Sequence, residues 1–208
     1  MRGDTCNMVS LLCIAVMLVT PLSGAGVPDF YQQLPNFMTF LTTSQNVNPI
    51  LSRVVRQTKT SVPCCGHEKF SWSIITDEFN GCKEEIGDIE KKERIPCFFE
   101  CAGVKLGICD DEGYLKKDQA VELSPKFVEG DEALENFVKQ LAPKIADTIA
   151  NIPDDVRKQL KCNIAVYAYL RGLHFHMELM CPIEMQNPAD ECEKLRAEYR
   201  QLAEQKRG

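Results

Sequence analysis

Cysteine is the residue type whose number and spacing give the clearest chemical signal in this sequence. Eleven cysteines are present among 208 residues, and nine of them lie from residue 64 onward. In an oxidising compartment, such a density favours disulfides over metal binding. The nine candidates for disulfides are Cys64, Cys65, Cys82, Cys97, Cys101, Cys109, Cys162, Cys181 and Cys192. Because nine is odd, at most four bridges can close within one chain. The remaining thiol could form a disulfide with a second copy, so a covalent dimer is one alternative.

Spacing restricts which of these cysteines can pair. Cys97 and Cys101 are four residues apart in a predicted helix, so both face the same side and should bridge this helix to two other segments. Cys162 and Cys181 lie near the two ends of another predicted helix, about 28 Å apart, which excludes a bridge between them. Cys181 and Cys192 flank a turn and could pair.

Histidine, the commonest acid–base catalyst, occurs only three times. The run Cys64-Cys65-Gly66-His67 partly resembles secreted phospholipases A2, in which a catalytic histidine follows a cysteine pair after two residues. Here one residue intervenes, no further cysteine follows before Cys82, and no glycine-rich calcium loop precedes the motif. We therefore do not expect a phospholipase.

Metal sites and other catalytic motifs are not indicated either. His174 and His176 are two residues apart, so on a helix they point to different sides, and we expect one to be buried and the other exposed. The acidic run 110–113 would place Ile108 and Gln119 where a calcium loop requires carboxylates, so it is predicted to be a turn. No serine-hydrolase elbow, Walker loop or zinc-protease motif occurs. We expect no metal, no cofactor and no enzyme activity.

The first residues predict export. Arg2 precedes an apolar run from Met8 to Val19, and small residues follow at 23–26. This order is typical of a cleavable signal peptide, here residues 1–25 with cleavage near Ala25 or Gly26. The apolar run is too short to cross a bilayer, which takes about 20 residues. We expect a secreted, extracellular mature protein, residues 26–208.

Composition restricts the partners. The formal net charge is −6 and the isoelectric point is near 5.2. An acidic chain repels phosphate backbones, so nucleic acid is not expected as a partner. No segment after the signal peptide is long and apolar enough to span a bilayer, so membrane insertion is not expected.

Apolar residues recur at helical spacing along most of the chain. Near its start this pattern predicts helices at 30–41 and 50–59. The stretch 61–81 is irregular, with a short strand-like run at 71–75, and 89–94 is a charged connector. Further helices are predicted at 82–86, 96–107 (opened by Pro96), 115–123, 131–151, 153–180 and 187–206. We expect a single compact all-α domain of about seven helices, cross-linked by disulfides.

The run from Cys97 to Gly107, with the turn at 110–113, resembles the second and third cysteines of insect odorant-binding proteins. The pair Cys64-Cys65, the dipeptide Cys181-Pro182 and Cys192 resemble the Plus-C subgroup of that family. The resemblance implies a helical domain around an apolar cavity that binds volatile or lipid-like molecules, without catalysis.

The sequence also departs from the subgroup. Gly172 stands where the subgroup has a cysteine, and the helix at 131–151 lacks one. Both of these missing cysteines form disulfides in the family, so Cys97 and Cys181 would lack their usual disulfide partners. They would then pair with each other, or Cys109 would substitute.

These observations predict an extracellular carrier, as in olfaction, that transports small hydrophobic molecules such as odorants, pheromones or lipid-like ligands. The pocket walls are expected to come from Phe137, Leu141, Ile145, Tyr167, Leu170 and Phe175. The extra C-terminal helix should pack across the helix at 153–180, tethered by Cys192, as a lid. The alternative is a secreted, non-catalytic interaction or structural protein with a filled core.

Overall fold

A computed structural model describes residues 60–157 and 160–204. The predicted signal peptide and the predicted helices at 30–41 and 50–59 lie outside the described residues. All described residues belong to one structural unit of the chain.

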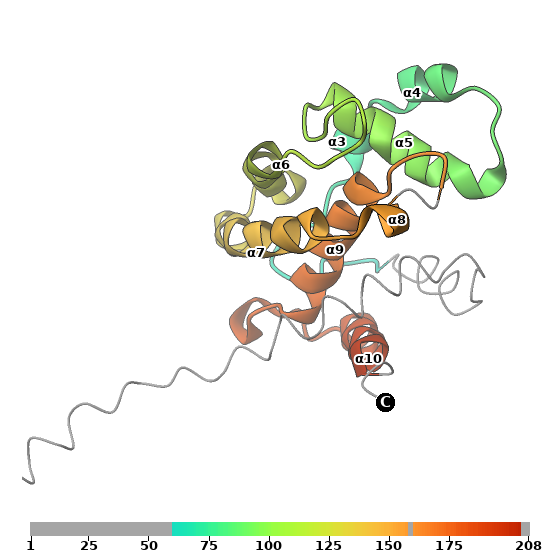
Figure 1. Ribbon diagram of the computed structural model, residues 1–208. Helices are drawn as coiled ribbons and strands as arrows, with labels where there is room; N and C mark the ends of the chain where they lie inside the picture. Colours follow the sequence, from blue (N-terminus) through green and yellow to red (C-terminus); the bar gives the residue numbers. More distant parts are fainter. Residues whose placement is uncertain (1–59, 158–159, 205–208) are drawn as a thin grey trace, which may run out of the picture. The chain divides into compact units, whose positions relative to one another are not determined.

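All named secondary-structure elements of the described residues are helices, which confirms the all-α prediction (Figure 1). The α-helices are α3 (Ser73–Thr76), α4 (Phe79–Ile86), α5 (Lys91–Lys105), α6 (Lys117–Leu123), α7 (Glu132–Ala150), α8 (Asp154–Arg157), α9 (Ala165–Leu179) and α10 (Asp190–Glu204). Two 3₁₀ turns complete them, η1 (Ser124–Val128) and η2 (Ile183–Met185). The strand predicted at 71–75 is wrong, because Ser73–Thr76 forms the short helix α3. None of the described helices is long and apolar enough to traverse a bilayer.

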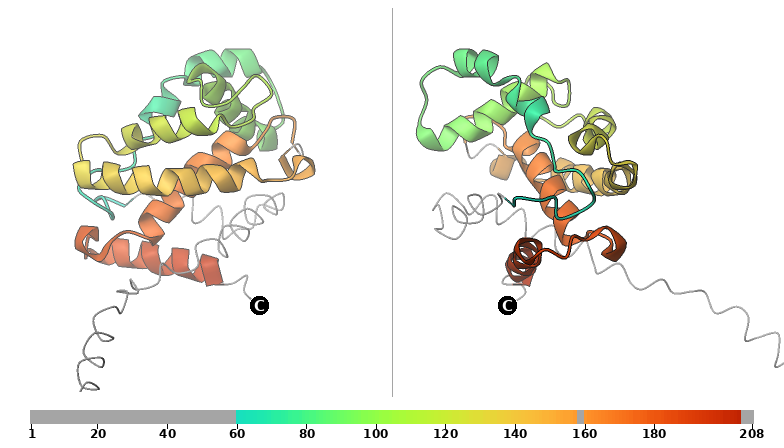
Figure 2. Two further views of the ribbon diagram at one scale, coloured as in Figure 1. Left: turned by 60° about the vertical axis from the view of Figure 1, so that its left-hand side comes forward. Right: turned by 180° about the vertical axis from the view of Figure 1, so that it is seen from behind.

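The core lies between α7 and α9, which pack against each other, and α6 also packs along α7 (Figure 2). On α7 an apolar stripe repeats every three or four residues, as helical periodicity requires. Its buried members are Leu134, Val138, Leu141, Ile145 and Ile149, each at most 3% exposed. On α9, Tyr169 is fully buried, and its hydroxyl donates to the Ala120 carbonyl at 3.1 Å. The buried hydroxyl of Tyr169 therefore has a hydrogen-bond partner inside the core.

The predicted helix at 131–151 and the predicted turn at 110–113 are confirmed. The Asp131 side chain caps α7 by accepting a hydrogen bond from the Leu134 amide at 3.0 Å. Asp110 Oδ1 accepts from the amides of Glu112 (3.0 Å) and Tyr114 (2.8 Å). Gly113 closes this turn at φ 77°, a conformation that favours glycine.

The continuous helix predicted at 153–180 is wrong, because α8 ends at Arg157 and α9 begins only at Ala165. Backbone amides between the two helices donate to acidic side chains of α5. The Lys161 amide donates to Glu93 at 2.8 Å, and the Asn163 amide donates to Glu100. Contacts from a helix some 65 residues earlier thus replace the hydrogen bonds that a continuous helix would have made.

Helix α5 begins at Lys91, so the prediction that Pro96 opens it is wrong. Pro96 lies in the second turn, where its missing amide leaves only one earlier carbonyl, that of Lys92, without a helical partner. Residues 91–94 of the charged run predicted as a connector therefore form the first turn of α5, and residues 89–90 precede it.

Four disulfides join the described segments: Cys64–Cys192, Cys65–Cys181, Cys82–Cys101 and Cys97–Cys162. The prediction that Cys97 and Cys101 bridge α5 to two different segments is confirmed. Among the described cysteines, Cys109 alone is free, and it is buried.

The alternative bridges Cys97–Cys181 and Cys181–Cys192 do not form, and Cys109 replaces no lost partner. Cys97 bonds the segment that precedes α9, whereas Cys181 follows the end of α9. A helix of 15 residues separates the two positions by about 22 Å, beyond the reach of a disulfide.

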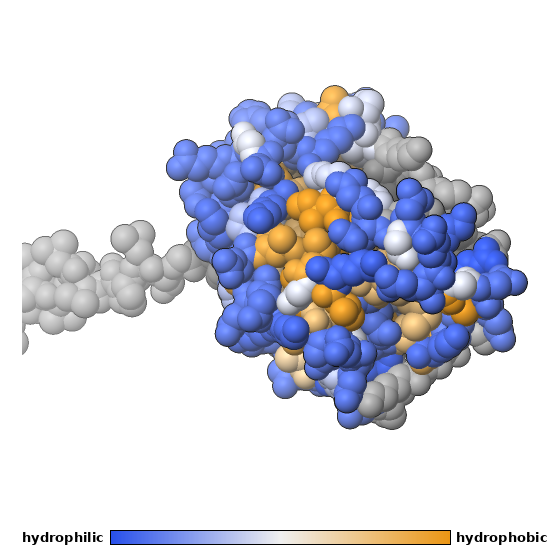
Figure 3. All heavy atoms as spheres, turned by 90° about the horizontal axis from the view of Figure 1, so that it is seen from above, coloured by the Kyte–Doolittle hydropathy of each residue, from blue (hydrophilic) through white to orange (hydrophobic). Residues whose placement is uncertain are grey.

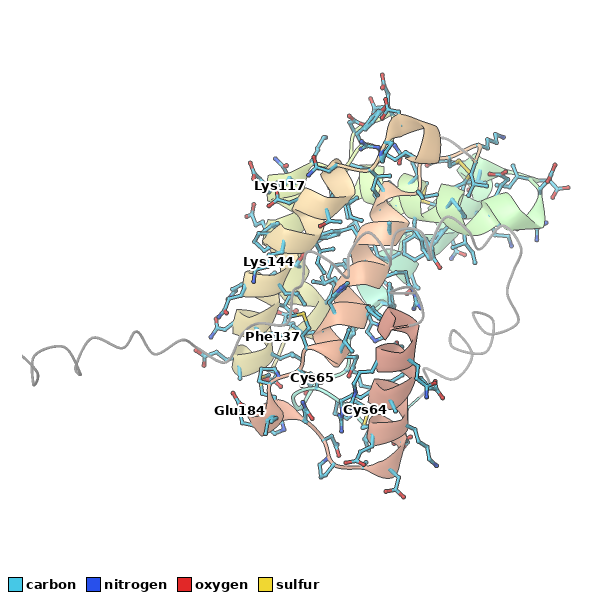
Figure 4. The ribbon with its side chains drawn as sticks, turned by 60° about the horizontal axis from the view of Figure 1, so that its bottom comes forward. Cys64, Cys65, Lys117, Phe137, Lys144 and Glu184 are labelled. Atoms are coloured by element: carbon cyan, nitrogen blue, oxygen red, sulfur yellow. A yellow bond between two sulfur atoms is a disulfide. The ribbon has the colours of Figure 1, made fainter. Side chains whose placement is uncertain are left out.

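Helix α10 packs on the C-terminal half of α9, as predicted, with the Tyr199 and Phe175 rings 4.6 Å apart. The predicted tether through Cys192 is present, and its partner is Cys64, which precedes α3. Figure 4 shows Cys64 and Cys65 in this region, beside α10. The role of α10 as a lid stays a prediction.

Candidate functional site

The most distinctive grouping of side chains is a set of rings that we call the aromatic cluster. It comes from the segment before α3, from α5, from η1 and from α9. Its members are Phe70, Trp72, Phe99, Phe127, Tyr167 and His174. Phe70 and Phe127 are buried and stack with their centroids 5.1 Å apart, whereas the other four are only partly buried. The cluster thus has a packed base and a partly exposed rim.

Trp72, the only tryptophan of the chain, has three ring neighbours in this cluster. Its centroid lies 4.8 Å from that of Phe70, 5.8 Å from His174 and 6.3 Å from Phe99. The last two contacts are edge-to-face, an arrangement that aromatic rings prefer over a face-to-face sandwich. Phe99 in turn meets Tyr167 at 5.1 Å. A chain of rings therefore runs from the segment before α3 across α5 to α9.

Backbone contacts and disulfides hold these rings in place. The Ser71 amide donates to the Phe127 carbonyl at 2.7 Å, which fixes the Phe70–Trp72 segment against η1. The Cys97–Cys162 bridge joins α5, just before Phe99, to the segment just before α9. Tyr167 and His174 are seven residues apart, two helical turns, so they lie on the same face of α9. The cluster depends on these links between distant parts of the chain.

His174 is neutral at physiological pH. Burial lowers its pKa to about 3, and the positive charge of Arg171, one turn earlier on α9, acts in the same direction. A neutral imidazole can donate one hydrogen bond and accept another. The rim of the cluster therefore combines apolar rings with one uncharged polar group.

The structure distributes the six predicted pocket residues over three places. Leu141, Ile145 and Leu170 are buried in the core between α7 and α9. Tyr167 belongs to the aromatic cluster, and Phe175 packs against Tyr199 of α10. Phe137 is partly buried on α7 (Figure 4). Of the six residues, only Tyr167 lies in the cluster.

The other residues that could do chemistry are not assembled into a centre. His67 is exposed, and its backbone amide donates to Asp131. His176 is buried, with Nδ1 2.9 Å from the Gly172 carbonyl, and burial lowers its pKa to about 4. His174 is partly buried and not exposed as predicted, because it packs among the rings of Phe70 and Trp72. Within residues 60–157 and 160–204, no three potential ligands gather around a metal position.

Sequence reasoning missed most of the aromatic cluster. Phe70, Trp72 and Phe127 lie outside the long predicted helices, so helical periodicity gave them no role. The one available signal was the only tryptophan, two residues after Phe70 in an irregular stretch. Because the rings come from four separate segments, only the tertiary structure shows that they meet.

Apolar side chains also reach the surface of the molecule. Figure 3 shows the molecule from above the view of Figure 1, in which α4 and α5 lie near the top. On this face a patch of hydrophobic residues is surrounded by hydrophilic ones. Apolar patches rimmed by polar residues are typical of sites that bind a ligand or another protein.

No protein-family model, no curated protein and no solved structure matches this chain at a significant level. The class that the structure itself defines is therefore a disulfide-linked, all-α protein with a partly exposed aromatic cluster.

Proposed function

We propose that this protein is a secreted, non-catalytic carrier that binds small hydrophobic molecules at the rim of the aromatic cluster. The observation that supports the proposal most is the partial exposure of four rings, Trp72, Phe99, Tyr167 and His174, around a buried aromatic base. Four disulfides are typical of proteins in oxidising compartments and agree with an extracellular location.

The physical reason is the free energy of covering apolar surface. Each Å² of apolar surface removed from water contributes about 25 cal/mol. Rings held by disulfides and packed neighbours need little reordering when a ligand arrives, so more of this free energy appears as affinity. An alkyl chain or a flat ring system of odorant size is chemically suited to such an apolar rim. Odorant-binding proteins, whose cysteine spacing this sequence resembles, bind ligands of the same kind.

Trp72 provides the experiment, because it is the only tryptophan and lies in the cluster. A hydrophobic alcohol such as 1-dodecanol, titrated into the purified protein, should change Trp72 emission saturably and displace a bound fluorescent apolar probe. Phe99→Ala should weaken the binding about tenfold or more. Phe137→Ala, a partly buried phenylalanine on α7, is the matched control and should leave it within about twofold.

Two results would contradict the proposal. The first is the absence of saturable binding across a panel of alcohols, esters, terpenes and fatty acids. That outcome favours the alternative, a secreted interaction or structural protein with a filled core. The second is a loss of binding in Phe137→Ala but not in Phe99→Ala, which would place the ligand on α7, where three of the six predicted pocket residues lie.

A further inference from the structure

Arg171 lies at the centre of α9, beside the aromatic cluster. It follows Tyr167 by four residues and precedes His174 by three, so all three side chains project from one face of the helix. Its positive charge adds to the burial that lowers the pKa of His174, and it acts against the burial that raises the pKa of Tyr199 on α10, so the guanidinium interacts electrostatically with both groups. In the sequence of α9, Arg171 therefore lies between Tyr167 and His174 of the cluster, one turn before Phe175, whose ring packs against Tyr199 of α10.

Arg171 is unusual among the cations of the described chain. Four lysines and arginines there are at least partly buried: Lys144, Arg157, Arg171 and Arg196. Arg157 lies 3.5 Å from Asp154, Arg196 donates to two backbone carbonyls, and Lys144 also has an interaction. Within residues 60–157 and 160–204, no hydrogen bond or ion pair engages the side chain of Arg171.

A partly buried guanidinium without an acceptor is open to an anion. It carries five donors in a planar fork that matches the two oxygens of a carboxylate. The neighbouring His174 ring has aromatic contacts on Phe70 and Trp72, and no hydrogen bond of its ring nitrogens is present among the described residues. Among the described residues, two nitrogen-bearing groups one turn apart on α9, next to apolar rings of the cluster, thus lack a hydrogen-bond partner from the protein.

We propose that the carrier site selects acidic amphiphiles, with Arg171 pairing the carboxylate and the rim of Trp72, Phe99 and Tyr167 covering the apolar chain. This inference rests on the proposed carrier function and names its ligand class. The chain as a whole is acidic, with a net charge of −6, so no general attraction draws anions to it. The selectivity for an anion therefore depends on the local charge of Arg171, helped by one hydrogen bond from His174.

A matched pair of ligands tests this inference. Dodecanoic acid and 1-dodecanol have the same chain and differ in the charged headgroup, and Trp72 emission reports the binding of both. The full-length protein should bind the acid at least about tenfold more tightly than the alcohol, because charge-assisted hydrogen bonds exceed neutral ones. Arg171→Gln should remove this preference and leave the affinity for the alcohol within about twofold.

Two further variants separate charge from geometry and from folding. Arg171→Lys keeps the charge but loses the planar fork, so it should retain part of the preference for the acid. Arg200→Gln, an exposed arginine of α10, is the matched control and should change neither affinity. Circular dichroism of each variant identifies any that fails to fold.

Each outcome has a distinct meaning. Equal affinities for acid and alcohol in the unmodified protein, or an equal loss of both in Arg171→Gln, would overturn the role of Arg171 while the carrier function stands. A failure of both ligands and of all other apolar probes to bind would overturn both proposals.

Discussion

Glu178, near the end of α9, is a carboxyl group with only 6% of its surface exposed. Its Oε2 has no hydrogen-bond partner among the described residues. Arg196 of α10 is also buried, but it donates to the backbone carbonyls of Cys64 (3.3 Å) and Asn187 (3.0 Å). Burial therefore raises the pKa of Glu178 to about 7, although the charge of Arg196 acts in the opposite direction.

The raised pKa makes Glu178 a source of pH-dependent instability. In the unfolded chain its pKa is 4.5, so the folded protein holds the proton more tightly. Below pH 4.5 the group is protonated in both states and carries no cost. As the pH rises through the folded pKa, the free energy of unfolding falls, by about 3 kcal/mol in total at 1.36 kcal/mol per pKa unit.

Glu178→Gln keeps the shape of the side chain and removes its titration. The difference in the free energy of unfolding between variant and unmodified protein should therefore shift in favour of the variant by about 3 kcal/mol between pH 4.5 and 7.5. His174 and His176 titrate in both proteins, so their contributions cancel in the difference.

Urea unfolding at pH 4.5, 6.0 and 7.5, followed by circular dichroism with disulfides intact, measures this difference. Glu193→Gln, at an exposed glutamate of α10, is the matched control, because it makes the same chemical change on the surface of the same region. A constant difference between Glu178→Gln and the unmodified protein at all three pH values would refute the reasoning.

Three other perturbations test the packing. The loop closed by Cys65–Cys181 lies inside the loop closed by Cys64–Cys192, and their separations of 116 and 128 residues differ by only 12. While Cys65–Cys181 is intact, Cys64–Cys192 therefore closes a loop of only about 12 further residues in the unfolded chain. The double variant Cys64→Ala/Cys192→Ala should lower the free energy of unfolding in urea by about 3 kcal/mol, and not by the ~5 kcal/mol of an isolated 128-residue loop. Gly113→Ala should lower the free energy of unfolding by about 2–4 kcal/mol, because a Cβ there would meet Glu100 and Asn163. Gly87→Ala, at φ 66° with open space around it, should cost only about 1 kcal/mol, and equal losses at both sites would contradict the packing of the turn. Cys109 is 1% exposed, and burial raises the pKa of its thiol to about 12. The thiol should therefore react with a thiol reagent only after unfolding. Rapid reaction of the folded protein would contradict its burial.

The elements that the sequence predicted well are those whose information is local. The stripe of α7 repeats with the helical period, and Asp131 stands where a cap is needed, so both the helix and its start could be read from neighbouring residues. The turn at 110–113 is similar, because the Asp110 side chain bonds amides two and four residues later.

The predictions that failed depend on partners far away in the chain. The break before α9 exists because Glu93 and Glu100 bond the amides of Lys161 and Asn163, a contact that no local pattern indicates. Disulfide connectivity has the same origin, since the position of Cys97 beside the start of α9 follows from how α5 packs. The aromatic cluster joins Trp72, Phe99 and Tyr167, and no periodicity relates residues so far apart.

The most direct test of the carrier function is to locate a bound ligand by nuclear magnetic resonance. With 1-dodecanol at saturation, the proposed site predicts intermolecular nuclear Overhauser effects between the alkyl protons and the indole protons of Trp72, together with the ring protons of Phe99 and Tyr167. Contacts confined to Phe137 and other side chains of α7, or no intermolecular contact at any ligand concentration, would contradict a hydrophobic-ligand site at the aromatic cluster.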